Sequence, residues 1–193
     1  QSSSVTALTD GGWLVTWKSF QSGTNGATIY QQRYTAAGTR TGGEVRVDTP
    51  FTPYNDKDLP KVTALADGGW LVCWQSAGQE GPGWDIYQRR YASDGTPIGA
   101  EVRVNTAIYG NQEEPVVTAL ADGGWVVTWQ SDEQDGSDSG IYQQRFNEAG
   151  SPIGGESRVN LTTTNAQSHP SVTARAYGGW LVRWMSFEQG GQP

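Results

Sequence analysis

The densest group of potential metal ligands in the sequence is an acidic loop between residues 132 and 138. Its carboxylates are Asp132, Glu133, Asp135 and Asp138, which are interspersed with Gln, Gly and Ser. Calcium takes about six to eight oxygen ligands, and a flexible loop of this composition can supply several of them. The alternative is an acidic loop that is simply solvated. Calcium at this loop is the only cofactor that the sequence indicates.

A second candidate site is the pair Trp84 and Asp85, which follows a stretch rich in Gly and Pro. An exposed indole beside polar groups can stack on the apolar face of a sugar ring, because its π face is apolar and its edges are polar. The pair therefore predicts a carbohydrate-binding site. The alternative is that Trp84 folds back over the edge of a sheet.

Carboxylates that could act as an acid and a base also recur, but in a symmetric arrangement. Glu44, Glu101 and Glu156 recur one segment after Arg33, Arg89 and Arg145, and we expect cross-strand ion pairs between the two sets. Acid–base catalysis needs carboxylates with different pKa values, and nothing in the repeats singles out one pair. The sequence has no nucleophile motif, metal-ligand cluster or phosphate loop. It therefore predicts no catalytic residues and no enzyme.

Two residues with reactive side chains occur only once. Cys73 replaces a Thr in a predicted strand, so it predicts a small buried side chain and excludes an intramolecular disulfide. His169 precedes Pro170 in a loop whose counterparts carry Leu59 and Glu114. We expect neither residue to act as a nucleophile, base or ligand.

The elements that position all these residues come from a repeat that occurs four times. Its marker is Asp-Gly-Gly-Trp at Trp13, Trp70 and Trp125, with Tyr-Gly-Gly-Trp at Trp180, at intervals of 57, 55 and 55 residues. A fixed period of this size indicates a repeat architecture. Gly-rich turns of this kind supply the positive φ angles of a tight hairpin.

Each marker opens a strand that is apolar on both faces. In Trp13-Leu14-Val15-Thr16-Trp17, alternation places the two Trp and Val on one face and Leu and Thr on the other. Such a strand needs cover on both faces, which predicts a sheet held between two neighbouring sheets.

Four short strands per repeat predict an all-β fold of four-stranded antiparallel sheets, like the blades of a β-propeller. The first, third and fourth strands are expected around 5–8, 28–34 and 44–48 in the first repeat, with Pro60, Pro115 and Pro170 at the entrance of later repeats. The repeats span about 1–56, 57–111, 112–166 and, in part, 167–193, which amounts to about three and a half blades in a single domain, 1–193. The alternative is an open β-sheet stack or a solenoid.

Composition excludes several classes of protein. A formal net charge of −7 and a pI near 4.6 argue against a nucleic-acid partner, which normally meets a basic patch. The sequence has no long apolar run, so membrane insertion is not expected, and its first residues do not form a signal peptide.

The repeat as a whole resembles those of very large secreted bacterial proteins of the RTX and adhesin type. The resemblance lies in residues 119–131 (Ala-Leu-Ala-Asp-Gly-Gly-Trp-Val-Val-Thr-Trp-Gln-Ser), in 140–146 (Gly-Ile-Tyr-Gln-Gln-Arg-Phe) and in 150–160. It implies an extracellular or cell-surface location, a role in adhesion, and an association with calcium. The Gly-Gly-x-Gly-x-Asp pattern of the RTX β-roll does not occur.

These observations predict a non-enzymatic, secreted, structural or adhesive repeat protein that self-associates. The last repeat is half built, and the strand that carries Trp180, Val182 and Trp184 would offer an unpaired edge to another chain. Self-assembly into a homo-oligomer or filament is the expected result. The alternative is a propeller lectin whose partners are glycans.

Overall fold

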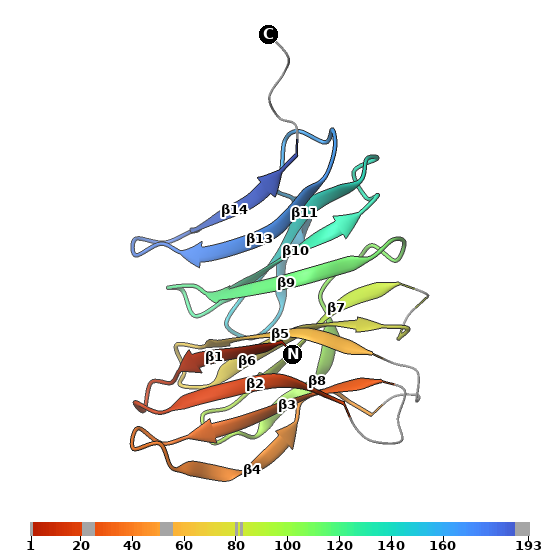
Figure 1. The fold of residues 1–193 in the computed structure, drawn as a ribbon. Coiled ribbons are helices and arrows are strands. Elements are labelled where there is room, and N and C mark those ends of the chain that lie inside the picture. Colours follow the sequence, from red (N-terminus) through yellow and green to blue (C-terminus); the bar gives the residue numbers. More distant parts are fainter. Residues whose placement is uncertain (1, 21–25, 51–55, 80, 82, 188–193) are drawn as a thin grey trace.

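The computed structural model describes residues 2–20, 26–50, 56–79, 81 and 83–187. This part of the chain contains fourteen β-strands in four antiparallel sheets (Figure 1). Three sheets have four strands each and the fourth has two, always in chain order. No helix among the described residues is long and apolar enough to cross a membrane. The prediction of an all-β fold of four-stranded antiparallel sheets is confirmed.

We call the sheets blades one to four. Blade one contains β1 (Ser3–Ala7), β2 (Trp13–Phe20), β3 (Ala27–Tyr34) and β4 (Arg40–Arg46). Blade two contains β5 (Lys57–Ala64), β6 (Trp70–Ala77), β7 (Trp84–Tyr91) and β8 (Pro97–Arg103). Blade three contains β9 (Gln112–Ala119), β10 (Trp125–Asp132), β11 (Ser139–Phe146) and β12 (Pro152–Arg158). Blade four contains β13 (Gln167–Ala174) and β14 (Trp180–Ser186).

Each residue of the Asp-Gly-Gly turn has its own backbone role, as blade two shows. The Asp67 carboxylate accepts a hydrogen bond from the Gly69 amide (3.0 Å), which holds the turn. Gly68 has a φ of +85°, where a side chain would be strained. A Cβ on Gly69 would lie 2.2 Å from the carbonyl oxygen of Tyr91, so only glycine fits beside the end of β7.

The blades pack face to face, and the Trp face of each blade meets the other face of the preceding blade. Trp70, Val72 and Trp74 of blade two pack against Leu14 and Ile29 of blade one. Blade three repeats the arrangement on blade two, with a core made by Leu71, Cys73, Ile86, Val104, Trp125, Val127 and Trp129. Because every inner blade is covered on both sides, its central strand is apolar on both faces, as predicted.

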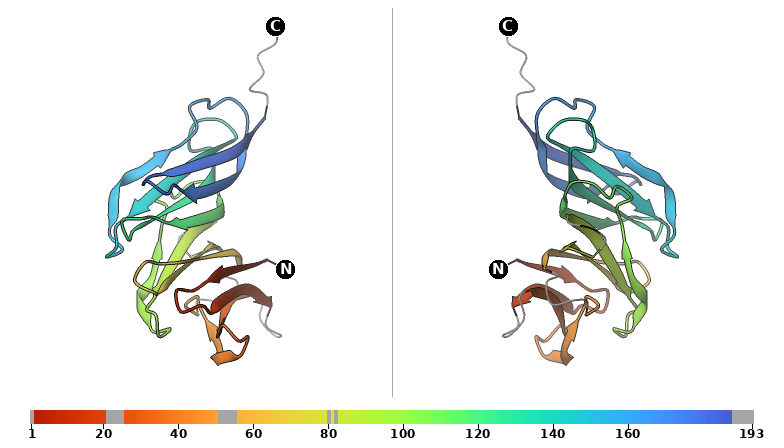
Figure 2. Two further views of the ribbon diagram at one scale, coloured as in Figure 1. Left: turned by 90° about the vertical axis from the view of Figure 1, so that its left-hand side faces the viewer. Right: turned by 90° about the vertical axis from the view of Figure 1, so that its right-hand side faces the viewer.

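The first strands of the blades lie side by side, and the last strands lie on the opposite side of the molecule. β1 contacts β5, β5 contacts β9, and β9 contacts β13. We call these first strands, β1, β5, β9 and β13, the inner strands. Figure 2 shows them on the side where the N-terminus lies, with β12 on the far side. Side chains on β5, β9 and β13 can therefore come together, although about 55 residues separate them in the sequence.

The fourth strands begin earlier than the sequence predicts. β4 starts at Arg40, directly after the turn, rather than at Glu44. Its ladder with β3 is interrupted between the Gln31–Val45 and Arg33–Thr41 pairs, and Gly42, inside this bulge, has a φ of +68°. The glycines that hid the strand in the sequence thus form a bulge within it.

The prediction that three prolines stand at strand entrances is also wrong. Pro60, Pro115 and Pro170 lie inside β5, β9 and β13 rather than at their entrances. Each stands in an irregular stretch of the ladder with the neighbouring strand, where its missing N–H interrupts no regular pair.

Candidate functional site

The residue before each of these prolines has a left-handed backbone. Leu59, Glu114 and His169 have φ values of +49°, +54° and +55°, and they occupy the same place on three adjacent inner strands. Such a conformation costs a non-glycine residue on the order of 1–3 kcal/mol and persists where the surroundings enforce it. One such enforcing contact is a hydrogen bond from the Glu114 amide to Gln75 Oε1 of the preceding blade (2.9 Å).

The strained backbone brings these side chains together around a cavity of about 240 Å³, which we call the inner-strand pocket. It is lined by Leu59, Lys61, Glu114, Val116, His169 and Pro170. The His169 amide donates a hydrogen bond to Glu114 Oε2 (3.1 Å), and His169 Nε2 lies 3.6 Å from Glu114 Oε1. The Glu114 carboxylate is thereby held in one orientation at the pocket wall.

A second carboxyl group, on Glu113, stands next to Glu114 in β9, although Glu113 is not among the residues that line the pocket. Its partial burial, together with the negative charges of Asp132 and Glu114, raises the pKa of Glu113 above its usual value. Glu113 therefore holds its proton to a higher pH than an ordinary glutamic acid. An acid with a raised pKa beside an oriented carboxylate is the arrangement that acid–base hydrolysis uses.

The repeat symmetry, on which the prediction of no enzyme rested, is broken at this position. Glu113 and Glu114 of blade three correspond to Asp58 and Leu59 of blade two, and to Ser168 and His169 of blade four. The two adjacent carboxyl groups thus occur in one blade of these three. The signal was present in the sequence, where the counterparts of His169 could be read. The sequence did not predict that the three inner strands β5, β9 and β13 bring these counterparts together.

The cross-strand Arg–Glu pairs predicted from the sequence are wrong. The counterpart of Arg33 and Arg145 in blade two is Arg90 rather than Arg89, which donates to the Val47 carbonyl oxygen instead. Each of these three arginines pairs with the Asp of its own Asp-Gly-Gly turn; Arg90 Nη2, for example, lies 2.6 Å from Asp67 Oδ2. The glutamates bind elsewhere. Glu101, for instance, accepts a hydrogen bond from the Thr49 amide (2.7 Å). The turn that starts each central strand thus also orients an arginine.

The acidic loop contains hydrogen-bonded carboxylates rather than a converging set. Asp132 accepts from Asn111 Nδ2 (3.1 Å), and Asp135 accepts from the Ser137 amide (3.2 Å) and from Asn160 Nδ2 (3.3 Å). The described residues contain no group of three or more His, Cys, Asp or Glu side chains placed to hold a metal ion. Calcium binding by Asp132, Glu133, Asp135 and Asp138 stays a prediction.

Trp84 and Asp85 begin strand β7 rather than lying in a loop. Trp84 is half-buried and Asp85 is buried, with its Oδ1 accepting a hydrogen bond from Asn105 Nδ2 (2.7 Å). Neither residue lines the inner-strand pocket. Sugar binding by this pair stays a prediction, while the contact with Asn105 gives Asp85 a structural role.

The Trp face of β14 is directed at blade three. Trp180 is half-buried and donates a hydrogen bond from Nε1 to Gln143 Oε1 (2.8 Å), and Val182 and Trp184 share its face. The residues between them, Leu181, Arg183 and Met185, are the exposed ones. The face that we assigned to self-association is therefore turned towards the chain's own third blade.

Comparison with known proteins identifies the fold. No protein-family model matches the chain, and neither does any curated protein. Among solved structures, an endo-arabinase from Bacteroides thetaiotaomicron is similar with a TM-score of 0.58 and 15% identity, over 96% of this chain and 75% of that one. A GH32 β-fructofuranosidase from Bombyx mori has a TM-score of 0.50 and 10% identity, over 86% of this chain and 39% of that one. The propeller-like arrangement of the blades is therefore confirmed.

The same comparison corrects the predicted function. The similar solved structures are enzymes, whereas we predicted a non-enzymatic structural or adhesive protein. At this level of identity the likeness establishes the fold alone. A propeller of repeated blades is nevertheless a fold on which enzymes are built, so the repeat architecture gives no reason to exclude catalysis.

Proposed function

We propose that this chain belongs to a carbohydrate-active propeller that hydrolyses glycosidic bonds at Glu113 and Glu114, beside the inner-strand pocket. The observation that carries the proposal is the pairing of Glu113, whose pKa is raised, with the oriented Glu114 carboxylate. The similarity to an endo-arabinase and a β-fructofuranosidase suggests arabinans and β-fructofuranosides as the first substrates to test.

In the proposed reaction the two glutamates have different tasks. Glu113 donates its proton to the leaving glycosidic oxygen as the bond to the anomeric carbon breaks. A water molecule adds its oxygen to that carbon and gives a proton to the Glu114 carboxylate. His169 is a positioning residue, because its backbone amide donates a hydrogen bond to Glu114 Oε2.

The test is the release of reducing ends from arabinan and from a β-fructofuranoside polymer by the 193-residue chain. Replacing Glu113 or Glu114 by Gln keeps the side-chain size and removes the proton transfer, and should lower the rate about 100-fold or more. Glu44→Gln, on exposed strand β4, is the matched control and should leave the rate unchanged. The proposal is wrong if the wild-type chain releases no reducing ends, or if neither substitution in β9 lowers the rate.

The pH dependence provides an independent check. A general acid works while it is protonated, so activity should fall as the pH rises through the raised pKa of Glu113. Glu113→Asp shortens the side chain and should lower the rate, but it should keep a falling alkaline limb. Glu113→Gln should remove that limb from any residual activity.

A further inference from the structure

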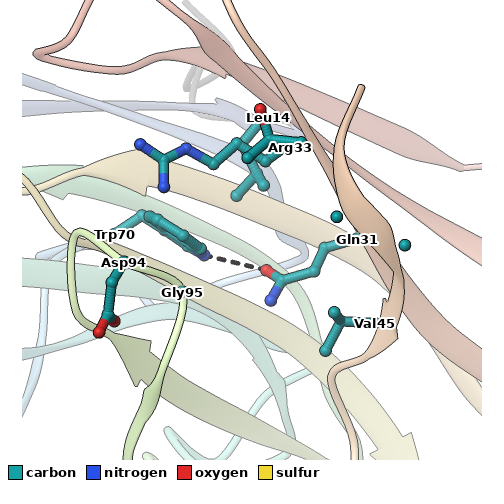
Figure 3. A pocket seen from close by; sticks show the side chains of 10 residues that line it. Leu14, Gln31, Arg33, Val45, Trp70, Asp94 and Gly95 are labelled. Carbon is teal, nitrogen blue, oxygen red and sulfur yellow. Dashed lines mark hydrogen bonds between the residues drawn. The ribbon is translucent and has the colours of Figure 1, made fainter. Parts of the chain in front are cut away.

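The first two blades enclose a second polar cavity, far along the chain from Glu113, which we call the blade-junction pocket. It has a volume of about 190 Å³ and is formed by Leu14, Gln31, Val45, Trp70 and Asp94, together with the bulge at Gly42. Figure 3 shows the Trp70 indole between Asp94 on one side and the Gln31 amide on the other. The cavity is smaller than the roughly 300–1,000 Å³ of sites for drug-sized ligands, so it suits one small molecule.

The amide of Gln31 is a hydrogen-bond donor without a protein partner. Gln31 is 3% exposed, and its Oε1 accepts the indole N–H of Trp70 (2.9 Å), which fixes the orientation of the amide. Among the described residues none accepts a hydrogen bond from Gln31 Nε2, and the residue lines the pocket. This nitrogen is not among the fully buried atoms that lack a partner, so it is open to the pocket and can donate a hydrogen bond to a bound molecule in place of water.

The charges around the pocket favour a neutral ligand. Arg33 is already bound to Asp10 (2.5 Å) and to the Ser93 carbonyl oxygen (2.6 Å). Asp94 contributes a carboxylate, which repels an anion, and the Arg33 guanidinium repels a cation. The Thr96 amide, by donating a hydrogen bond to Asp94, lowers the pKa of that carboxyl, so it is ionised and accepts hydrogen bonds.

From these groups we propose that the blade-junction pocket binds a single monosaccharide unit, as a site separate from the inner-strand pocket. A sugar ring has hydroxyl groups on its edge that can accept from Gln31 and donate to Asp94. Its C–H faces match the apolar surfaces of Leu14, Val45 and Trp70.

The junction of blades two and three contains the natural control. Its cavity, about 180 Å³ in volume, has Gln88 and Trp125 in the same relation, with Gln88 Oε1 accepting from Trp125 Nε1 (2.9 Å). Ala149 stands there in place of Asp94, and Ala100 in place of Gly43. This second cavity keeps the donor but has lost the carboxylate, so it should bind sugars more weakly.

The experiment is an NMR titration of the ¹⁵N-labelled chain with millimolar L-arabinose, D-fructose, D-glucose and D-galactose. At least one sugar should shift the Gln31 side-chain amide signal and leave that of Gln88 in place. Asp94→Ala copies the second cavity and should weaken binding about tenfold or more, because a hydrogen bond to a charged group is lost.

The reciprocal variant, Ala100→Gly with Ala149→Asp, should create a second site and make the Gln88 signal move as well. Unfolding curves of each variant confirm that the fold is kept. The inference is overturned if no sugar moves the Gln31 signal, if Asp94→Ala binds as tightly as the wild type, or if the reciprocal variant gains nothing. The Glu113→Gln variant leaves the blade-junction pocket intact and should give the same Gln31 shift as the wild type, so the failure of one proposal does not imply the failure of the other.

Discussion

The two complete junctions between neighbouring blades share one framework. In each, a Trp of one blade donates its indole N–H to a Gln of the preceding blade, and an Arg lies over the same indole. Trp70 meets Gln31 and Arg33 at the first junction, and Trp125 meets Gln88 and Arg90 at the second. Aromatic side chains on the second and third strands of the three four-stranded blades stack beside this framework, as Trp70 does on Tyr91.

The junctions differ at one buried position, which is residue 57 at the first junction and residue 112 at the second. The first junction has Lys57, 1% exposed, with its Nζ 3.9 Å from the buried carboxylate of Asp48, which also binds Arg46 Nη2 (2.7 Å). The second has neutral Gln112, whose Oε1 accepts the indole N–H of Trp129 (3.1 Å). Lysine cannot accept this bond, so the indole N–H of Trp74 is buried without a partner among the residues that the structure describes. The same backbone frame thus accommodates a charged pair or an amide, but the charged pair leaves one polar group unsatisfied.

The largest expected effect tests what the junctions share. Trp70→Ala and Trp125→Ala should each lower the free energy of unfolding by about 3–5 kcal/mol, because both indoles are almost fully buried. Urea denaturation at neutral pH measures both values. A difference of more than about 1 kcal/mol between the two variants would show that the junctions are not energetically equivalent.

Exchanging the residues at positions 57 and 112 should change the free energy of unfolding in opposite directions at the two junctions. Gln112→Lys buries an ammonium group beside neutral Asn105 and removes the acceptor of Trp129, so it should destabilise by about 3–5 kcal/mol. The variant Lys57→Gln copies the second junction into the first and keeps the ion pair between Arg46 and Asp48. It should stabilise the chain by about 1 kcal/mol, measured by the same urea titration, because the new amide oxygen can accept the indole N–H of Trp74. Destabilisation by this variant would mean that the contact between Lys57 and Asp48 is favourable.

The unsatisfied indole can be tested with a smaller change. Trp129→Phe leaves Gln112 Oε1 without its donor, whereas Trp74→Phe removes an N–H that has no partner. The first substitution should therefore cost about 1 kcal/mol more than the second, since the loss of ring area is the same. Equal losses in thermal unfolding would show that Trp74 also has a hydrogen-bond partner in solution.

The smallest effect concerns the Asp–Arg pairs at the edge of both junctions. Partial burial raises the pKa of Asp67, but hydrogen bonds from Arg90 and the Gly69 amide lower it by more. The net result is a pKa below the usual 3.8. Because the folded-state pKa is the lower one, this carboxylate stabilises the fold above pH 3.8, and the contribution is lost as the pH falls through the lowered value.

Asp67→Asn should therefore reduce stability at pH 7 by no more than about 1 kcal/mol, and the difference should disappear in strong acid. Unfolding curves from pH 2 to 7 provide the measurement. Glu44→Gln, which removes an exposed carboxylate from β4, is the control. A gap between wild type and Asp67→Asn that persisted at pH 2 would exclude the ion pair as its cause.

Much of the fold follows from local sequence signals. Trp70-Leu71-Val72-Cys73-Trp74 predicts a strand that is covered on both faces, and the structure buries all five residues. The start of β4 was missed because Gly42 and Gly43 are not typical strand residues, although the bulge they form lies within the ladder. Pro60 was assigned to a strand entrance for a similar reason, since local rules do not reveal an irregularity that depends on the partner strand.

The candidate sites were harder to predict than the strands. Asp10 was read only as a turn residue, because the Arg33 that it binds lies 23 positions further along the chain. Glu114 and His169 were recognised as counterparts in the repeat. The residues around them in the sequence do not show that a left-handed backbone directs both side chains into one cavity. Gln31 was not predicted as a site residue, because its amide is oriented by Trp70, which belongs to the next blade.

By itself the sequence determined the repeat, the hairpins and the alternation of buried faces, because turn geometry and side-chain periodicity act over a few residues. The packing of one blade on the next was decided only in three dimensions. That packing orients the amide of Gln31 and joins Glu114 to His169. These two contacts link residues 39 and 55 positions apart, for which the sequence carries no local signal.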